Sequence, residues 1–280
     1  MACYPAEMER VADLHTHTRH SDGLYDPRDL VDRAVAAGIS ILCISDHDNL
    51  AASREMVAFA RAAGILLISG TELSCQHDGV DVHVLAYGVD VDDPELETRL
   101  SSFRRTRDTR GEMMVDRLRE LGYPVSIDRV REIAGNGALG RPHVARALVE
   151  MGAVDSLDTA FRKFLGDGRP AFVDKQRFRI DEVVELVHNA GGITSVAHPS
   201  VYRDHRRIVN ELIEAGIDGI ETRHPDVDEP QRDYYEKLAR DRGLFTTGGS
   251  DDHGNGGPKT IGQILVPESQ IAKLLDRIDA

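Results

Sequence analysis

Histidines and carboxylates cluster early in the chain, in the segment VADLHTHTRHSD. Side chains alternate between the two faces of an extended strand, so Asp13, His15 and His17 share one face, and Asp22 follows after a turn. Two imidazoles at positions i and i+2 of a strand can bind one metal ion. An HxH pair alone is a weak indication of a metal site, so its meaning depends on the other strands.

Further candidate ligands stand at the ends of other apolar runs. The runs ILCISDHD, ILLISGTE and GGITSVAHP carry His47, Glu72 and His198, DVHVLAYG carries His83, and FTTGGSDDH ends in Asp251 and His253. Six of the seven predicted strands bear or closely precede such a residue. Buried polar groups cost stability when they have no partner, so chance is a poor explanation for this placement. The pattern predicts a site for several metal ions.

The candidate ligands are six neutral imidazoles and three carboxylates: His15, His17, Asp22, His47, Glu72, His83, His198, Asp251 and His253. This set suits three divalent ions at about three ligands apiece, with a carboxylate such as Glu72 as a bridge. Nitrogen and oxygen ligands without thiolate are compatible with manganese, our first choice, and with iron or zinc. Three ions bring roughly +6 and the carboxylates about −3, so the pocket favours an anion, and phosphate fits best.

The elements that must position these residues alternate along the chain. Seven apolar runs predict strands at residues 11–15, 41–45, 65–69, 82–87, 193–197, 217–221 and 244–247, and helix-like stretches cover 27–37, 51–62, 180–190, 206–215 and 229–242. Apolar strands alternating with helices predict an α/β fold around a parallel sheet, and seven of them suggest a barrel. Active sites in such barrels lie at the carboxyl ends of the strands, where most of the candidate ligands fall.

The alternation stops between residues 101 and 175, where charged helical sequence replaces strands. We therefore predict a barrel over residues 1–100 and 176–280, with a helical insertion over 101–175 that covers the active site. The first half of the insertion is rich in arginine, which indicates either a functional cationic surface or a solvated helix face. The sequence leaves these two interpretations open.

Composition excludes several classes of function. The 280 residues carry 34 Lys and Arg against 48 Asp and Glu, a formal net charge of −14. Such an acidic chain is a poor partner for long duplex nucleic acid or an anionic membrane. No apolar stretch approaches the ~20 residues that span a bilayer, and the chain begins without a signal-peptide core. Three cysteines without a CxxC pair predict no disulfide scaffold, and we expect a cytoplasmic protein.

The motifs HTHTRHSDG, ISDHD, GTELS, HVLAYG, SVAHP and GSDDHG, in this order, resemble those of the PHP (polymerase and histidinol phosphatase) family. They extend from residue 13 to residue 254. The resemblance implies a distorted (β/α)7 barrel that holds three metal ions, with the nine candidate residues as ligands. It also implies hydrolysis of a phosphate ester.

The insertion resembles that of a subgroup with a GRPH motif, here Gly140 to His143, and a PAFVDK stretch that ends at Lys175. The subgroup implies a phosphatase acting on 3′,5′-bisphosphonucleotides, such as adenosine 3′,5′-bisphosphate, or a nuclease acting on the 5′ ends of short RNA. Its partner is thus a small phosphorylated molecule. We predict that Arg141, His143 and Lys175 bind the substrate, and that Arg141 and His143 act in catalysis with His198.

The expected mechanism is attack on phosphorus by a metal-activated hydroxide. His15, His17, Glu72, His83 and His198 would chiefly hold two ions, and Asp22, His47 and His253 the third. Three alternatives stay open: a histidinol-phosphate-type or other small-molecule phosphatase, a metal-dependent amidohydrolase, and a non-catalytic module attached to a polymerase. Excess positive charge favours phosphorus over a carbon centre, and we expect no polymerase because these 280 residues contain no polymerase sequence.

Several polar residues are predicted to stand outside the ligand set. Asp46 and Asp48 flank His47 and either orient imidazole N–H groups or form a simple turn. Five histidines are assigned to the surface or to helix faces: His20, His77, His188, His205 and His224. Cys43 and Cys75 are expected to be small core residues.

Overall fold

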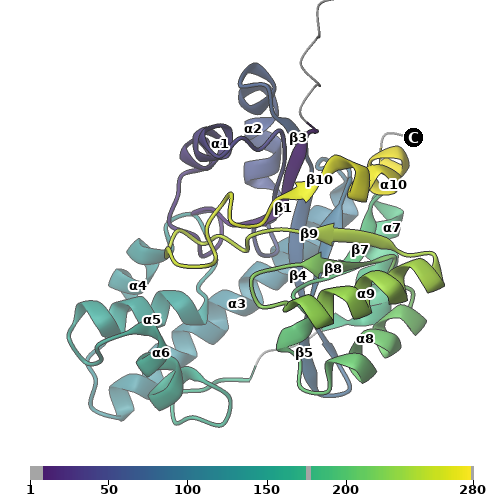
Figure 1. The fold of residues 1–280 in the computed structure, drawn as a ribbon. Coiled ribbons are helices and arrows are strands. Elements are labelled where there is room, and N and C mark those ends of the chain that lie inside the picture. The colour runs from purple at the N-terminus through teal and green to yellow at the C-terminus, as the bar shows by residue number, and fades with distance from the viewer. Residues whose placement is uncertain (1–8, 175–177, 279–280) are drawn as a thin grey trace, which may run out of the picture.

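The computed structural model describes residues 9–174 and 178–278. Its strands and helices form a barrel-like α/β body and a lobe of helices beside it (Figure 1). None of the helices within these residues is both long and apolar enough to cross a bilayer.

Within the described residues, ten strands form two sheets. The first has the order β10 (Val266–Pro267), β1 (Val11–Thr16), β2 (Ile41–Ile44) and β3 (Leu66–Ile68). The second has the order β6 (Phe178–Arg179), β4 (Gly70–His77), β5 (Val80–Tyr87), β7 (Ile193–Val196), β8 (Gly219–Arg223) and β9 (Phe245–Gly248). In the described part of the chain, two isolated bridges, Thr16 to Asp252 and His47 to Glu72, link a strand of one sheet to a residue that follows a strand of the other. The predicted α/β class is confirmed. At these two points the ring of strands is joined by one bridge each.

Two strands run against the predicted parallel order: β10, which pairs with β1, and β5. β5 is antiparallel to both β4 and β7, and β4 itself was not predicted. The link between β4 and β5 is Asp78-Gly79, whose φ angles are 46° and 78°. Positive φ at both central residues defines the tight hairpin turn for which Asp-Gly is a preferred sequence. The reversal places His83, near the start of β5, at the edge where the parallel strands end.

Helices cover the outside of the barrel: α1 (Pro27–Ala36), α2 (Ala51–Ala62), α7 (Ile180–Asn189), α8 (His205–Glu214), α9 (Glu229–Arg242) and α10 (Glu268–Ile278). α2 and α9 have the predicted bounds. α9 illustrates why such ends are readable: the Asp228 side chain accepts a hydrogen bond from the Gln231 amide, and Gly243 closes the helix at φ 72°. A capping carboxylate and a left-handed glycine are strong local stop signals.

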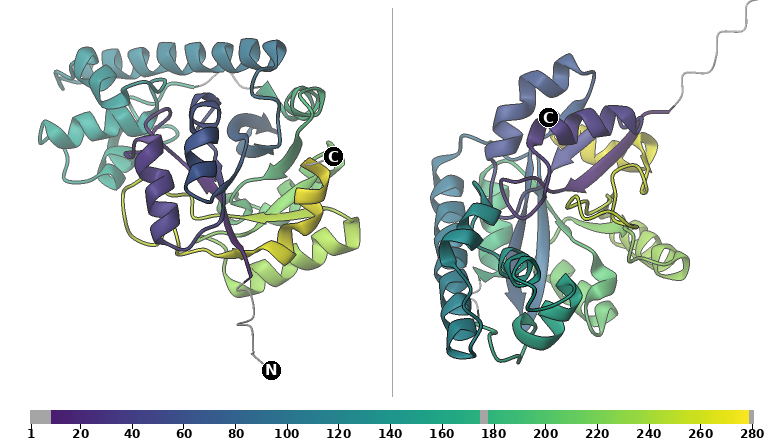
Figure 2. Two further views of the ribbon diagram at one scale, coloured as in Figure 1. Left: turned by 90° about the horizontal axis from the view of Figure 1, so that it is seen from above. Right: turned by 90° about the vertical axis from the view of Figure 1, so that its left-hand side faces the viewer.

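The insertion contains α3 (Pro94–Glu120), α4 (Ile127–Ala134), α5 (Arg141–Glu150), α6 (Leu157–Ala160) and a π-helical turn, η1 (Phe161–Leu165). It has an apolar core of its own, which includes Met114 and Leu118. The first turns of α3 instead bury Leu100 and Phe103 in the core of the barrel. Helix α3 therefore runs along the barrel into the lobe of helices (Figure 2) and joins the two cores.

Candidate metal centre

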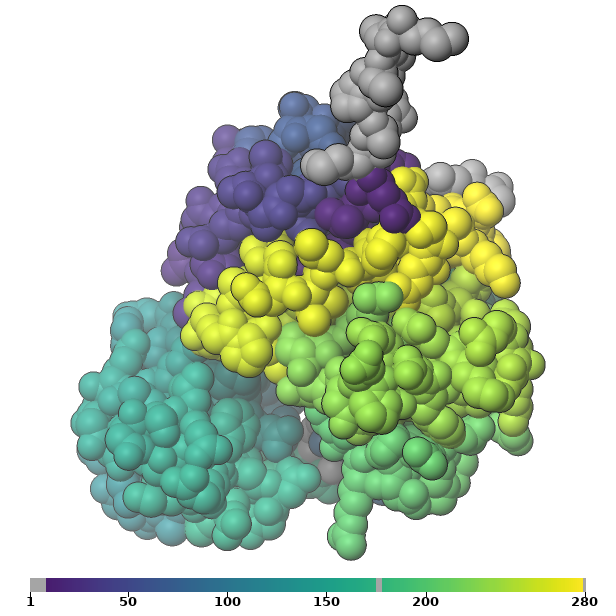
Figure 3. Space-filling model, viewed as in Figure 1, coloured from purple at the N-terminus to yellow at the C-terminus, as the bar shows by residue number. Residues whose placement is uncertain are grey.

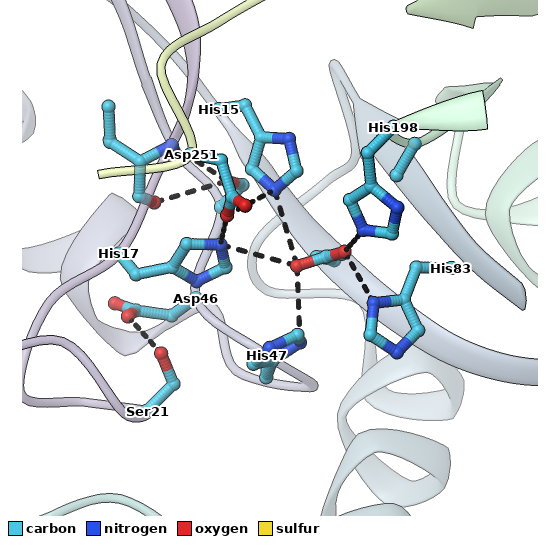
Figure 4. Close-up of polar contacts among 12 residues, drawn as sticks. His15, His17, Ser21, Asp46, His47, His83, His198 and Asp251 are labelled. Carbon is cyan, nitrogen blue, oxygen red and sulfur yellow. Dashed lines mark hydrogen bonds and ion pairs between the residues drawn. The ribbon is translucent and has the colours of Figure 1, made fainter. Parts of the chain in front are cut away.

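Glu72 lies at the centre of a ring of imidazoles at the carboxyl edge of the strands. Its Oε2 atom is 3.3 Å from His15 Nε2, 3.2 Å from His17 Nε2 and 3.2 Å from His47 Nδ1. Its Oε1 atom is 2.7 Å from His83 Nδ1 and 3.0 Å from His198 Nε2. These five rings come from different parts of the fold and point toward one carboxylate (Figure 4).

A second cluster adjoins the first. Asp22 Oδ1 is 3.2 Å from His253 Nε2 and 3.9 Å from His47 Nε2. Together with His17, these residues offer one ligand atom each within 4.8 Å of one another. Asp251 Oδ1 lies between the clusters, 3.5 Å from His15 Nε2 and 3.4 Å from both His17 Nε2 and His253 Nδ1. The structure thus brings all nine sequence-predicted ligands together.

The donor atoms of the centre are better suited to binding metal ions than to hydrogen bonding with one another. Among the described residues, several buried polar atoms have no hydrogen-bond partner, including His15 Nε2, both nitrogens of His17, Asp22 Oδ1 and His47 Nδ1. Such orphaned atoms are expensive unless something else satisfies them. Bare imidazole nitrogens facing carboxylate oxygens are the usual ligands of divalent transition metals.

The carboxylates of the centre are held in the charged form. Burial alone would raise the pKa of Glu72, but the surrounding imidazoles, led by His47 and His83, hold that pKa well below its usual range. The pKa of Asp22 is likewise lowered against burial, chiefly by His253 and His47. Ionised carboxylates are the form that binds metal.

Strained backbone supports two of the candidate ligands. His198 and Asp251 have φ angles of 30° and 54°, in a region that residues with a Cβ rarely adopt. Gly249, just before Asp251, packs so tightly that an added Cβ would lie 2.4 Å from the amide nitrogen of His15. The chain therefore needs glycine at 249 to bring the β9 loop against β1.

Two residues that the sequence analysis missed complete the base of the centre. Glu221 is fully buried on β8; its Oε1 is 2.9 Å from His15 Nδ1, and its Oε2 accepts a hydrogen bond from the His198 amide. Occupying Nδ1 leaves His15 Nε2 free to face the centre. The assignment of His224 to the surface was wrong, because it is 2% exposed and its Nε2 lies 3.4 Å from Asp251 Oδ2. Glu221 is the last residue of the predicted strand 217–221, and His224 follows shortly after it. The same placement at a strand end identified the other candidate ligands.

Asp46 and Asp48 accept hydrogen bonds from a neighbouring loop and from the insertion, an arrangement that favours the turn role over the orienting role. Asp46 accepts hydrogen bonds from the Thr18 amide and the Ser21 hydroxyl, at 2.7 and 2.6 Å, and so holds the loop that leads to Asp22. Asp48 accepts a hydrogen bond from Arg107 Nε at 2.6 Å. Cys43 and Cys75 are buried in the core as expected, and the histidines at 20, 77, 188 and 205 lie outside the centre.

A cavity of about 140 Å³ connects the centre to the insertion. Its lining is Asp22, His47 and His83 on the metal side, with Ser74, Arg107, Arg110, Arg141, Pro142 and Phe161 on the other. Figure 3 shows a hollow between the helical lobe and the barrel. Arg107 and Arg110 were noticed in the sequence only as part of an arginine-rich stretch, although their spacing of three places them on one face of α3.

The three arginines differ in how far their charges are already paired. Arg107 is paired with Asp48, and Arg141 Nη1 is 3.0 Å from Asp167 Oδ1. Arg110 makes no ion pair among the described residues, and its Nε donates to the carbonyl of Val173. Burial and then the nearby Arg141 and Arg107 lower the pKa of Arg110 to about 10. The cavity therefore contains crowded positive charge that an anion would relieve.

Of the predicted substrate-binding residues, Arg141 lines the cavity and His143 does not. His143 is 1% exposed; its Nδ1 accepts a hydrogen bond from the Gly140 amide, and a second hydrogen bond joins the ring to the backbone of Ser21. Burial lowers its pKa to about 4, so the ring is neutral near pH 7. Both ring nitrogens of His143 are therefore occupied by hydrogen bonds to backbone groups. Lys175 lies outside the described residues.

The insertion also grips the loop that carries Asp22. Arg146 Nη2 donates to the carbonyl of Asp22 at 2.8 Å, and a Cβ on Gly137 would lie 2.1 Å from the carbonyl oxygen of Ser21. Together with the hydrogen bond between His143 and the backbone of Ser21, these contacts connect α5 and the loop before it to the loop that carries Asp22.

Residues 13–239 match the PHP domain family. The chain belongs to this family. Among the relatives of this PHP protein, the 5′-3′ exoribonuclease of Haemophilus influenzae is 34% identical over 88% of the chain and 91% of that protein. The 3′,5′-nucleoside bisphosphate phosphatase of Chromobacterium violaceum is 33% identical over 89% of the chain and 90% of that protein.

Two solved structures share the fold of the PHP protein. One is assigned to a metal-dependent phosphoesterase of Bifidobacterium adolescentis and the other to an amidohydrolase of Chromobacterium violaceum with bound sulfate and no metal. Each is 30% identical, covers 95% of this chain and 96% of its own, and has a TM-score of 0.86. Together, the family and the relatives confirm the sequence-based prediction of a metal-dependent phosphoesterase, a hydrolase.

Proposed function

We propose that this PHP protein removes one phosphate from nucleoside 3′,5′-bisphosphates, such as adenosine 3′,5′-bisphosphate, and also acts at the 5′ ends of short RNA. One observation carries the proposal: a single cavity has the candidate ligands Asp22, His47 and His83 on one side and three arginines on the other. A molecule with two phosphates on one ribose matches that arrangement. Relatives named for these two activities support it.

The nine residues gathered at the barrel edge are proposed to hold three divalent ions, with manganese as the first choice. Among the described residues, four overlapping ligand groups lie at this edge, and three of them consist only of the predicted ligands: His17, Asp22, His47 and His253; His15, His17 and Glu72; and His47, Glu72 and His83; the fourth is His15, Glu221 and His224. When bound, such ions supply a water of lowered pKa as the nucleophile and neutralise phosphate charge. Glu72 belongs to two of the groups and is the residue proposed to bridge ions.

The chain's own residues hold and orient the substrate. Arg110 and Arg141 are proposed to bind the phosphate that is not cleaved, since Arg110 forms no ion pair among the described residues and the ion pair of Arg141 there is with Asp167. Lys175 remains a proposed third contact. His198 serves as a metal ligand close to the reaction. The geometry of His143 supports a positioning role in place of the catalytic and substrate-binding roles predicted for it.

The two proposed domains supply different parts of the site. A barrel of residues 1–100 and 176–280 provides the ligands, and an insertion of residues 101–175 provides the arginines. α3 starts at Pro94 and is shared between them.

A substrate panel tests the proposed function. Purified protein loaded with manganese is assayed for phosphate release from adenosine 3′,5′-bisphosphate and histidinol phosphate, and for nucleotide release from a 5′-phosphorylated dinucleotide. We expect the highest kcat/KM for the bisphosphate, measurable release of nucleotides from the dinucleotide, and little turnover of histidinol phosphate. A preference for histidinol phosphate would overturn the proposal in favour of a small-molecule phosphatase.

A further inference from the structure

A π-helical turn directs one aromatic side chain toward the substrate cavity. η1 follows α6 directly and begins at Phe161. π-Helical turns are rare and occur frequently at functional sites. Phe164 and Leu165 of the same turn are buried in the core of the insertion, while Phe161 packs against that core and also lines the cavity. The turn thus has one ring committed to packing and another at the cavity wall.

The surroundings of Phe161 fit a planar aromatic ligand. The Arg141 guanidinium carbon lies 5.9 Å from the centroid of the Phe161 ring, and Asp167, just past the turn, holds that guanidinium by a 3.0 Å contact. Pro142 adds a further apolar surface in the same cavity wall. Aromatic rings and guanidinium planes are the surfaces on which proteins stack nucleobases. The cationic part of the cavity and its apolar part therefore meet at Arg141.

We propose that Phe161 stacks on the nucleobase of the substrate, so that the enzyme selects base-bearing bisphosphates over base-free sugar bisphosphates. This inference rests on the proposed function and adds a third feature to it: the metal side takes the phosphate to be cleaved, the arginines take the other phosphate, and Phe161 takes the base. Stacking accepts any base and strengthens with ring area, so purine substrates are preferred over pyrimidine ones.

The test compares two substrates across three variants. The substrates are adenosine 3′,5′-bisphosphate and its base-free analogue, 1-deoxyribose 3,5-bisphosphate. Phe161→Leu should lower kcat/KM for the adenosine compound by about tenfold to 100-fold, the range for loss of one stacked base, and leave the base-free analogue within about twofold. Phe161→Tyr keeps the ring and should keep the preference. Phe164→Leu, in the same turn but outside the cavity lining, should leave the ratio of the two substrates unchanged.

Each other outcome overturns a definite part of the account. An equal loss on both substrates in Phe161→Leu means that the ring only supports the fold of the insertion. No loss on either substrate means that the base lies elsewhere. If wild-type protein processes both bisphosphates equally well, the base is not recognised although the proposed function stands. If wild-type protein releases phosphate from neither, the proposed function fails as well.

Discussion

The two walls of the cavity are built on different principles. The barrel wall consists of buried carboxylates and imidazoles at strand ends, where Glu72 is 1% exposed and contacts five histidines. The insertion wall consists of longer side chains on helices, where Arg141 is 25% exposed and its partner Asp167 is 73% exposed. The first wall is buried, and the second is partly exposed to solvent.

The two walls meet two different requirements of a phosphatase, metal-assisted chemistry and substrate choice. Metal-assisted chemistry needs ligands placed to a fraction of an ångström, which strands and strained loops provide. Substrate choice needs charge and shape that can vary, which surface helices provide. Changes in the barrel wall should therefore affect all substrates, while changes in the insertion wall should affect some substrates more than others.

The largest effect is expected at the centre of the barrel wall. Glu72→Gln removes one negative charge and one oxygen ligand from two ligand groups, so bound manganese per chain should fall and kcat should drop by more than about 1,000-fold for every substrate. Elemental analysis and a phosphate-release assay measure both, and circular dichroism checks the fold. Glu55→Gln, on the exposed face of α2, is the matched control. Full metal content with full activity in Glu72→Gln would refute the bridging role.

The next effect concerns the helix that joins the two walls. Phe103 is 3% exposed in the barrel core and packs on Phe178, so Phe103→Ala should lower the free energy of unfolding by about 3–5 kcal/mol. Met113, on the same helix, is 46% exposed, and Met113→Ala should change the free energy by less than about 0.5 kcal/mol. Urea denaturation measures both. Equal, small changes would mean that α3 does not contribute to the barrel core.

A selective effect is expected at Arg110, the cavity arginine that forms no ion pair among the described residues. Arg110→Met should lower kcat/KM for adenosine 3′,5′-bisphosphate by about tenfold to 150-fold, because a charge-assisted hydrogen bond contributes roughly 1.5–3 kcal/mol. Turnover of adenosine 5′-monophosphate should change little. Arg117→Met, farther along α3, is the control, since Arg117 does not line the cavity. Equal losses on both nucleotides would assign Arg110 to general support of the fold.

The smallest effect is expected where the insertion grips the Asp22 loop. Arg146→Met and His143→Gln should each weaken manganese binding by about tenfold, because they loosen a segment that carries a ligand without removing the ligand. Burial lowers the pKa of His143 to about 4, so near pH 7 the ring is neutral and its one N–H is hydrogen-bonded to the backbone of Ser21. The shape of the pH profile of kcat should therefore be the same in His143→Gln as in the wild type. Loss of the alkaline limb of that profile would restore His143 as a proton donor.

The barrel wall could be predicted from the sequence, and the insertion wall only in part. Strand ends are marked by apolar runs, so polar residues that follow them, such as His47 and His198, stand out. Glu221 was missed although it is the last residue of a predicted strand, and β4 was missed because the Asp78-Gly79 turn signal was not used. Arginines on a helix give no such signal: Arg110 in the cavity and Arg117 outside it share the same local sequence character. Which face of α3 meets the barrel is decided by packing between distant segments.

The most direct test of the division between the two walls is a comparison of two nucleotides in two proteins. kcat/KM is measured for adenosine 3′,5′-bisphosphate and adenosine 5′-monophosphate, with wild type and Arg141→Met, at fixed manganese and salt. We predict a preference of about 100-fold for the bisphosphate in the wild type, from two charge-assisted contacts to the second phosphate, and a fall of at least about tenfold in that preference in the variant. Equal kcat/KM for the two nucleotides in the wild type would contradict the account, because the insertion would then not recognise the second phosphate.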